Sequence, residues 1–195
     1  MGFYGIDIYY LVLILPAIAF ALFAQARVKT TFQKFSSVRT VRGMTGAQAA
    51  QAILRANGIV NVRVERVSGN LTDHFDPRNN VIRLSDGVHD STSVASVGVA
   101  AHEAGHAVQY AEGYGPIKLR AAIIPVTQIG STLAMPLFII GLIFSFPLLM
   151  NIGIIFFGLS TVFQLITLPV EFNASSRALK IMESSGILHG DENRY

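Results

Sequence analysis

Three long apolar stretches dominate the pattern of hydrophobic and polar positions along this chain. They run from Ile6 to Ala24, from Ala121 to Phe146 and from Leu148 to Val170. The last two contain no charged residue, and the first contains only Asp7, near its outer end. Each stretch reaches the roughly 20 residues that an α-helix needs to cross a bilayer. The pattern therefore predicts three transmembrane helices.

Two alternatives exist for these stretches: a cleavable signal peptide for the first, and buried core helices for the other two. A signal peptide begins with a basic region, whereas residues 1–10 contain no lysine or arginine. The whole chain is 51% hydrophobic and only 14% charged, while about a quarter of the residues in a soluble domain are charged. Membrane helices explain both observations better than the alternatives do.

Residues 26–120 form a small polar unit in which two shorter helices are expected. Thr45 with Gln48 fits a capping box, so one helix should run from there to about Ala56. A second helix, capped around residues 90–93, should end near Glu112, because glycines follow it.

The same unit contains two patterns that are typical of strands. Valines alternate with polar residues from Val60 to Val64, and Val81–Ser85 is a second β-rich run. His74 falls between turn signals and is expected in a loop. If Val81–Ser85 is an exposed sheet edge, it could pair with the main chain of a bound peptide; the alternative is that it is only core sheet.

Basic residues gather next to the same end of each predicted membrane helix. They are Arg27, Lys29, Lys34, Arg39 and Arg42 after the first, Lys118 and Arg120 before the second, and Arg177 and Lys180 after the third. The positive-inside rule places all three groups in the cytoplasm, with the uncharged link near Pro147 outside. A nucleic-acid interface is not favoured, because the first group adjoins a membrane segment and has no interleaved aromatic residues.

The absence of cysteine narrows the possible chemistry. The chain has none, which excludes disulfides, thiol catalysis and zinc held by thiolates. Any metal must therefore be bound by histidine and carboxylate side chains.

The segment His102-Glu103-Ala104-Gly105-His106 is the clearest chemical signal in the chain. Two histidines four residues apart on a helix lie about 40° apart around its axis, so both can reach one ion. Glu103, between them, can take a proton from a water that the metal activates. The motif favours a zinc-dependent peptide hydrolase.

A catalytic zinc has a third protein ligand and one open position. The candidates for that ligand are His74, His89, His189 and the carboxylates. Glu171 is favoured, because it follows the third apolar stretch on the same predicted face as His102 and His106. His74 is the main competitor for the position of third ligand. Alternatively, His74 could donate a hydrogen bond to the oxyanion of the reaction intermediate. Tyr114 is a second candidate for this oxyanion role.

Three segments together resemble the bacterial YugP-like family of membrane zinc metallopeptidases. They are Leu71–Arg78, Val99–Ala107 and Leu168–Ser175. The resemblance implies a zincin site of the Glu-zincin type, with His102, His106 and Glu171 as Zn²⁺ ligands and Glu103 as the base. In similar membrane peptidases an aspartate four residues after the ligand glutamate orients a ligand histidine. Here that position is Ser175, and Ser175 or Asn173 would fill the role in part.

The expected fold is an α-helical integral membrane protein with a small α+β zincin-like metallopeptidase unit in the cytoplasm. We expect four segments: the first transmembrane helix (1–25), the catalytic unit (26–120), two transmembrane helices (121–170), and a cytoplasmic helix that carries the third ligand (171–195). Family members commonly continue into a further hydrophobic helix, so the sequence leaves open whether this chain is truncated or processed at its C-terminus.

The predicted function is that of a multi-pass endopeptidase in the bacterial plasma membrane. Its partners would be the lipid bilayer, a peptide or protein substrate that is itself membrane-associated, and a membrane protein partner or further copies of the chain; nucleic acid is not expected. Two alternatives remain: a membrane scaffold or regulator with a structural or vestigial metal site, and an intramembrane metalloprotease. A di-iron site is not favoured, because it would need a second Glu-x-x-His pair. A transporter is not favoured either, because it would need ionisable groups for coupling within its membrane segments.

Overall fold

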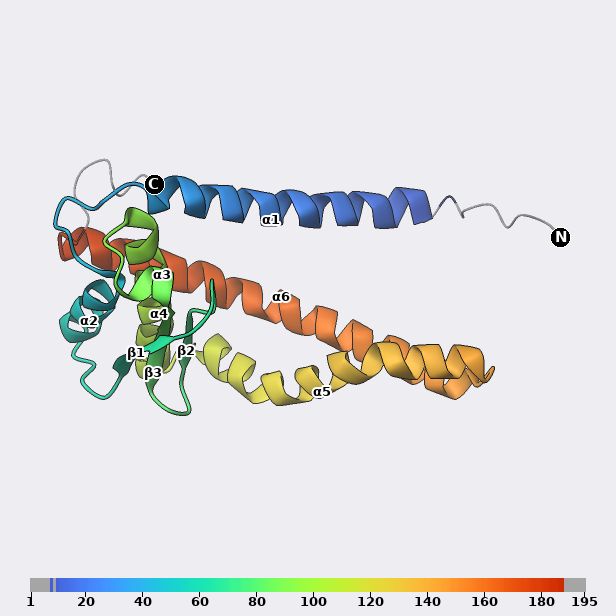
Figure 1. The fold of residues 1–195 in the computed structure, drawn as a ribbon. Helices are drawn as coiled ribbons and strands as arrows, with labels where there is room; N and C mark the ends of the chain where they lie inside the picture. The colour runs from blue at the N-terminus through green and yellow to red at the C-terminus, as the bar shows by residue number, and fades with distance from the viewer. Residues whose placement is uncertain (1–7, 9, 188–195) are drawn as a thin grey trace.

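The computed structural model describes residues 8 and 10–187, and its fold is mostly helical with one small mixed sheet. Figure 1 shows a cluster of short elements at one end, from which three long helices extend in the same general direction. The long helices are α1 (Leu15–Ser36), which continues a short π-helical turn η1 (Tyr10–Ile14), then α5 (Gly115–Ile143) and α6 (Pro147–Ser184). The short elements are α2 (Gly46–Ala56), β1 (Arg63–Val67), β2 (His74–Asp76), β3 (Val81–Ser85), α3 (Asp86–His89) and α4 (Val94–Ala111).

Within the described residues, three helical segments are long and apolar enough to cross a membrane: Leu11–Ser36, Gly115–Ile143 and Pro147–Ser184. In their most apolar windows the buried share of residues is 0%, 22% and 6%, respectively. The alternative of buried core helices is therefore wrong. Ile6 and Asp7, at the start of the first predicted span, lie outside the described residues.

The long helices extend further into the polar sequence than the hydropathy pattern predicted. α5 begins at Gly115, where Pro116 occupies a first-turn position that needs no N–H donor. α6 passes through Pro169 and continues to Ser184. We expected a separate helix to begin at residue 171. Up to Ser184, this segment is instead part of the same helix as the third apolar stretch. The hydropathy pattern shows where a helix changes from apolar to polar residues. It does not show where the backbone hydrogen bonds of the helix end, so the predicted boundaries are too short.

α5 and α6 form a hairpin that packs closely near its turn. A Cβ added at Gly153 of α6 would lie 2.7 Å from the carbonyl oxygen of Ala134 and 2.9 Å from the amide nitrogen of Phe138. No side chain fits in that space, so glycine allows the two backbones to approach. Figure 1 shows that the two helices are together at the turn and separate towards the cluster of short elements.

The sheet has the strand order β1-β3-β2, with β1 parallel and β2 antiparallel to β3. The prediction of a strand at Val81–Ser85 is confirmed, but the idea that it is an exposed edge is wrong, because β3 is paired on both sides. The strand predicted at Val60–Val64 is observed at Arg63–Val67. His74 begins β2 and does not lie in a loop; pairing with Arg83 on β3 makes this short segment a strand.

The core of the short-element cluster holds α4 in place. Ile53 of α2, Ile82 of β3 and Val97 of α4 are fully buried in it. The predicted capping box is confirmed: the side chain of Thr45 accepts from the Gln48 amide, and that of Gln48 accepts from the Thr45 amide. With one face against α2 and β3, α4 has a fixed orientation towards α6.

Candidate metal centre

α4 carries both histidines of the sequence motif on one face. Ser93 caps the start of this helix by accepting from the Ser96 amide. Four residues on a helix bring side chains to nearly the same direction, and the His102 and His106 rings lie 4.7 Å apart between centroids. His106 is buried, whereas the side chain of His102 is 28% exposed. The pair can therefore face a common ion from the floor of a partly open site.

Gly105, inside the same motif, allows α4 to approach α6. A Cβ at this position would lie 2.6 Å from the carbonyl oxygen of Ala174. Such a contact is too short for a side chain, so α6 would have to move away. The close approach places Glu171, about one helical turn before Ala174, beside the two histidines.

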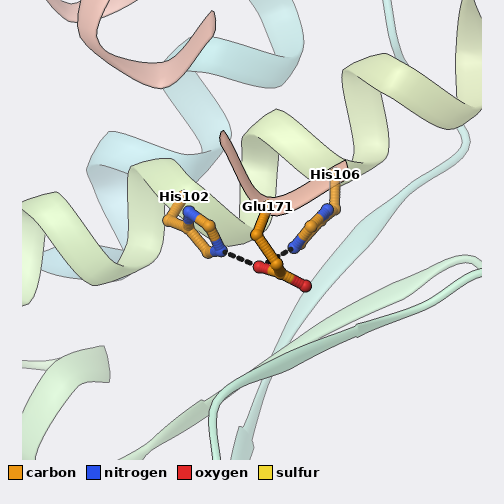
Figure 2. A group of neighbouring side chains, drawn as sticks. All are labelled: His102, His106 and Glu171. Carbon is orange, nitrogen blue, oxygen red and sulfur yellow. Dashed lines mark hydrogen bonds and ion pairs between the residues drawn. The ribbon is translucent and has the colours of Figure 1, made fainter. Parts of the chain in front are cut away.

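Glu171 joins the histidines through one of its two carboxylate oxygens, as Figure 2 shows. Its Oε2 lies 3.1 Å from Nε2 of His102 and 3.4 Å from Nε2 of His106. These three residues form a group whose ligand atoms all lie within 4.8 Å of one another. The structure thus brings together the three side chains that the resemblance named, from two different helices.

The arrangement fits a zinc ion in donor chemistry and in spacing. Two imidazole nitrogens and one carboxylate oxygen are a donor set found in catalytic zinc sites. Ligands bound tetrahedrally at zinc's usual distances would lie about 3.4 Å from one another. The two nitrogen-to-oxygen distances of 3.1 Å and 3.4 Å agree with this spacing.

Each histidine has a polar partner at its other ring nitrogen. His102 Nδ1 lies 3.1 Å from Oγ of Ser175, and His106 Nδ1 lies 3.0 Å from Oε1 of Gln109. A ring that donates from Nδ1 keeps the Nε2 lone pair free for a metal. Ser175 therefore lies where the sequence suggested an orienting residue, and Asn173 contributes only indirectly.

Gln109 is a functional candidate that the sequence reasoning missed. It is fully buried, and its amide nitrogen donates to the carbonyl oxygen of Val170 (2.8 Å) and to Oδ1 of Asn173 (2.9 Å). Asn173 in turn accepts from Nε of Arg177 at 2.7 Å. The signal that could have found Gln109 is a polar residue one turn after His106 on the buried side of the helix.

Glu103 lies between the histidines and is 9% exposed. Burial raises the pKa of its carboxyl above the ordinary value of 4.5; the charges of His106 and His102 and a hydrogen bond from the Phe75 backbone act in the opposite direction. For His102, burial lowers the pKa, but hydrogen bonding to Glu171 and the two nearby carboxylates outweigh it, and the net shift is upward. A buried carboxylate beside a metal site is suited to accepting a proton.

A cavity of about 200 Å³ lies in front of these groups. β2 supplies one side of it with His74 and Phe75, and the first turns of α5 supply another with Ile117, Arg120 and Ala121. Nδ1 of His74 lies 2.8 Å from the carbonyl oxygen of Thr72, so that nitrogen donates and Nε2 is left as an acceptor in the neutral ring. A neutral His74 is thus poorly arranged to donate to an oxyanion.

The remaining candidates lie elsewhere. His89 is close to Asp90, with 2.6 Å between Nδ1 and Oδ1, and is not a member of the metal-binding group. The ring of Tyr114 lies 5.8 Å from the guanidinium of Arg177 and is not part of the cavity lining within the described residues. His189 lies outside the described residues. Arg120 was expected only as a marker of topology, yet it contacts Glu171 at 2.9 Å.

Two helices that meet at a His-His-Glu group, with a further glutamate beside it, are typical of zinc metallopeptidases. Comparison with known proteins agrees: residues 10–195 match the model of the family described as "Putative neutral zinc metallopeptidase", and the chain belongs to this family. It is 45% identical over 183 residues to "Putative membrane protease YugP" of Bacillus subtilis (strain 168), covering 94% of this chain and 81% of that protein. No solved structure matches the chain. The resemblance inferred from the three sequence segments is confirmed.

Proposed function

We propose that this protein is a membrane-anchored zinc endopeptidase. The observation that carries the proposal is the convergence of His102, His106 and Glu171 on one point, beside the buried carboxylate of Glu103. A purely structural metal site would have no use for that carboxylate. The family supports a peptidase that uses zinc, and the cavity in front of the group supports a site that a peptide can enter.

In this proposal the two histidines and Glu171 hold the ion, and Glu103 transfers protons. When bound, zinc supplies Lewis acidity, which activates water and polarises a peptide carbonyl. The Glu103 carboxylate accepts a proton from the attacking water and delivers it to the nitrogen of the leaving amine. The Phe75 backbone interacts with this carboxylate, and both residues line the cavity. Ser175 and Gln109 hold the imidazole rings with Nε2 towards the ion.

The substrate in this proposal is an extended peptide or protein segment with an apolar side chain near the scissile bond. The lining of the cavity that belongs to α5 is apolar apart from Arg120: Ile117, Ala121 and Ile124. These residues recur at helical spacing, so they form one stripe on the cavity side of α5. Within the described part of the chain, β2 is paired on one side only, and its other edge offers main-chain groups to a bound peptide.

We further propose that the long helices anchor the peptidase unit, residues 26–120, to the cytoplasmic face of the bacterial plasma membrane. Two observations support a membrane location: the three apolar helices have exposed side chains, and the relative from Bacillus subtilis is named a membrane protease. The basic residues at the polar ends of these helices support the orientation. α4 is not among the described helices that are apolar enough to span a membrane, so the intramembrane alternative is not favoured.

The experiment is to measure zinc per chain and peptide cleavage in detergent-purified protein, with Glu171→Ala and Glu103→Gln as variants. We expect about one zinc per wild-type chain, a large loss of zinc in Glu171→Ala, and retained zinc without cleavage in Glu103→Gln. Full zinc retention in Glu171→Ala would refute the ligand assignment. Undiminished cleavage by Glu103→Gln would refute the role of that base.

A further inference from the structure

Arg120 contacts the carboxylate oxygen of Glu171 that does not face the histidines. Its Nη1 lies 2.9 Å from Oε1 of Glu171, whereas Oε2 is the oxygen next to the two Nε2 atoms. One oxygen of the Glu171 carboxylate thus faces the two histidines, and the other contacts the guanidinium of Arg120. The division matters because a carboxylate can bind a metal through either oxygen or through both.

The contact connects two helices that have separated at this point. Arg120 lies in the second turn of α5, and Glu171 lies in α6, at the end of the hairpin far from its turn. Figure 1 shows the ribbons of α5 and α6 apart at this end. A long side chain is needed to reach from one helix to the other, and arginine is always charged and has a planar, directional set of donors.

The surroundings of Arg120 are not those of an ion pair that serves stability alone. Among the described residues, its buried Nε has no hydrogen-bond partner, and an unsatisfied buried donor destabilises a fold. Its side chain also lines the cavity together with His102, Glu103 and His106. Arg120 thus contributes an unsatisfied buried donor and lies beside the candidate metal ligands. A role in the metal site explains these two facts better than a role in stabilising the fold.

We propose that Arg120 is a positioning residue that keeps Glu171 a one-oxygen ligand of the metal. This inference rests on the zinc site proposed above. With Oε1 engaged by the guanidinium, only Oε2 is available to the ion. A glutamate that bound through both oxygens would fill the coordination position that a catalytic zinc keeps open for water and substrate. By holding the Glu171 side chain in place before the ion binds, Arg120 supports the affinity of the site; by engaging Oε1, it keeps the open position free.

Arg83 provides a matched control. Its Nη1 also lies 2.9 Å from a carboxylate oxygen, Oδ2 of Asp76, and its side chain is 29% exposed, as that of Arg120 is. Neither partner in this second pair belongs to the metal-binding group. Arg83→Met therefore removes an equivalent ion pair from the same fold. Arg83 also lies 3.5 Å from Nε2 of His74, which lines the cavity but is not a member of the metal-binding group.

The test measures the zinc dissociation constant of full-length, detergent-purified protein by competition with a chelator. We expect Arg120→Met to bind zinc about 10-fold to 100-fold more weakly, because a Glu171 side chain that nothing holds in place must be ordered when the ion binds. Arg120→Lys should recover part of the loss, because it retains the charge and a donor. Arg83→Met should bind zinc as the wild type does. At saturating zinc, Arg120→Met should still have a lower kcat, since Glu171 can then bind through both oxygens.

Three outcomes overturn the inference. The first is wild-type zinc affinity in Arg120→Met. The second is an equal loss of affinity in Arg83→Met, which would reflect general destabilisation. The third applies if Arg120→Met does not fold: Arg120→Gln is then measured in its place, and wild-type zinc affinity in Arg120→Gln overturns the inference. A wild-type protein that binds no zinc would overturn the proposed function as well, whereas a zinc-binding wild type with an unaffected Arg120→Met overturns this inference alone.

Discussion

Oε1 of Gln109 lies 3.0 Å from Nδ1 of His106, three residues earlier on the same helix. The amide of Gln109 is itself held by the Val170 carbonyl and by Asn173, both on α6. The orientation of one candidate ligand ring therefore depends on the packing of α4 against α6. The same two helices supply all three candidate ligands.

Gln109→Leu should weaken zinc binding about 10-fold to 100-fold, because His106 loses the acceptor that fixes its ring. Leucine has a similar volume, so the loss should not come from a cavity. The zinc dissociation constant of the purified protein measures the effect. Gln51→Leu, at an exposed position of α2, is the control and should leave the affinity unchanged. Equal affinities of wild type and Gln109→Leu would remove Gln109 from the site.

Ser175→Asp should strengthen zinc binding about twofold to tenfold, since a carboxylate is a better acceptor for the Nδ1–H of His102 than a hydroxyl is. Ser175→Ala should weaken binding, because that acceptor is lost. Both variants can be compared by chelator competition. Ser176→Ala is the control, as this neighbouring side chain is exposed and has no contact with a histidine in the described structure. Identical affinities for alanine and aspartate at position 175 would contradict the orienting role.

Gly105→Ala should destabilise the protein by about 1–3 kcal/mol, because the new methyl group would lie 2.6 Å from the Ala174 carbonyl oxygen and force the helices apart. Zinc affinity should fall with it, as Glu171 moves away from the histidines. Thermal unfolding in detergent measures the first effect. Gly98→Ala, in the same helix, is the control: its added Cβ meets nothing within 4 Å, and alanine should stabilise the helix by roughly 0.5–1 kcal/mol. Destabilisation by both variants to the same extent would exclude the close approach as the cause.

Asp76→Asn should reduce stability at neutral pH, and by progressively less as the pH falls below the pKa of an unfolded aspartate. The hydrogen bonds from Asn79 and Arg83 hold the pKa of Asp76 well below its ordinary value of 3.8. A carboxylate whose pKa is lower in the folded state stabilises the fold above its unfolded pKa, and that stabilisation is lost as the pH falls. The difference in Tm between wild type and Asp76→Asn should therefore be largest above about pH 5 and shrink towards pH 3. A difference that is constant across this range would contradict the assignment.

Local periodicity was sufficient for several features of this protein. The helix that carries His102 and His106, the capping box at Thr45 and the strand Val81–Ser85 depend on neighbouring residues, so their patterns are readable in one dimension. The three apolar helices follow from length and composition in the same way. The family was also accessible, because its motifs are short and contiguous.

Only the tertiary structure decided which distant side chains meet. Glu171 is 65 residues after His106 along the chain, and its place beside the histidines depends on α4 packing on α6 at Gly105. Gln109 has only a weak local signal, its place one turn after His106, and Arg120 has none that separates it from a topology marker. His74 became part of a strand through pairing with Arg83 across the sheet. Such contacts depend on how elements pack, and packing is set by close approach and buried hydrogen bonds between residues far apart in the sequence.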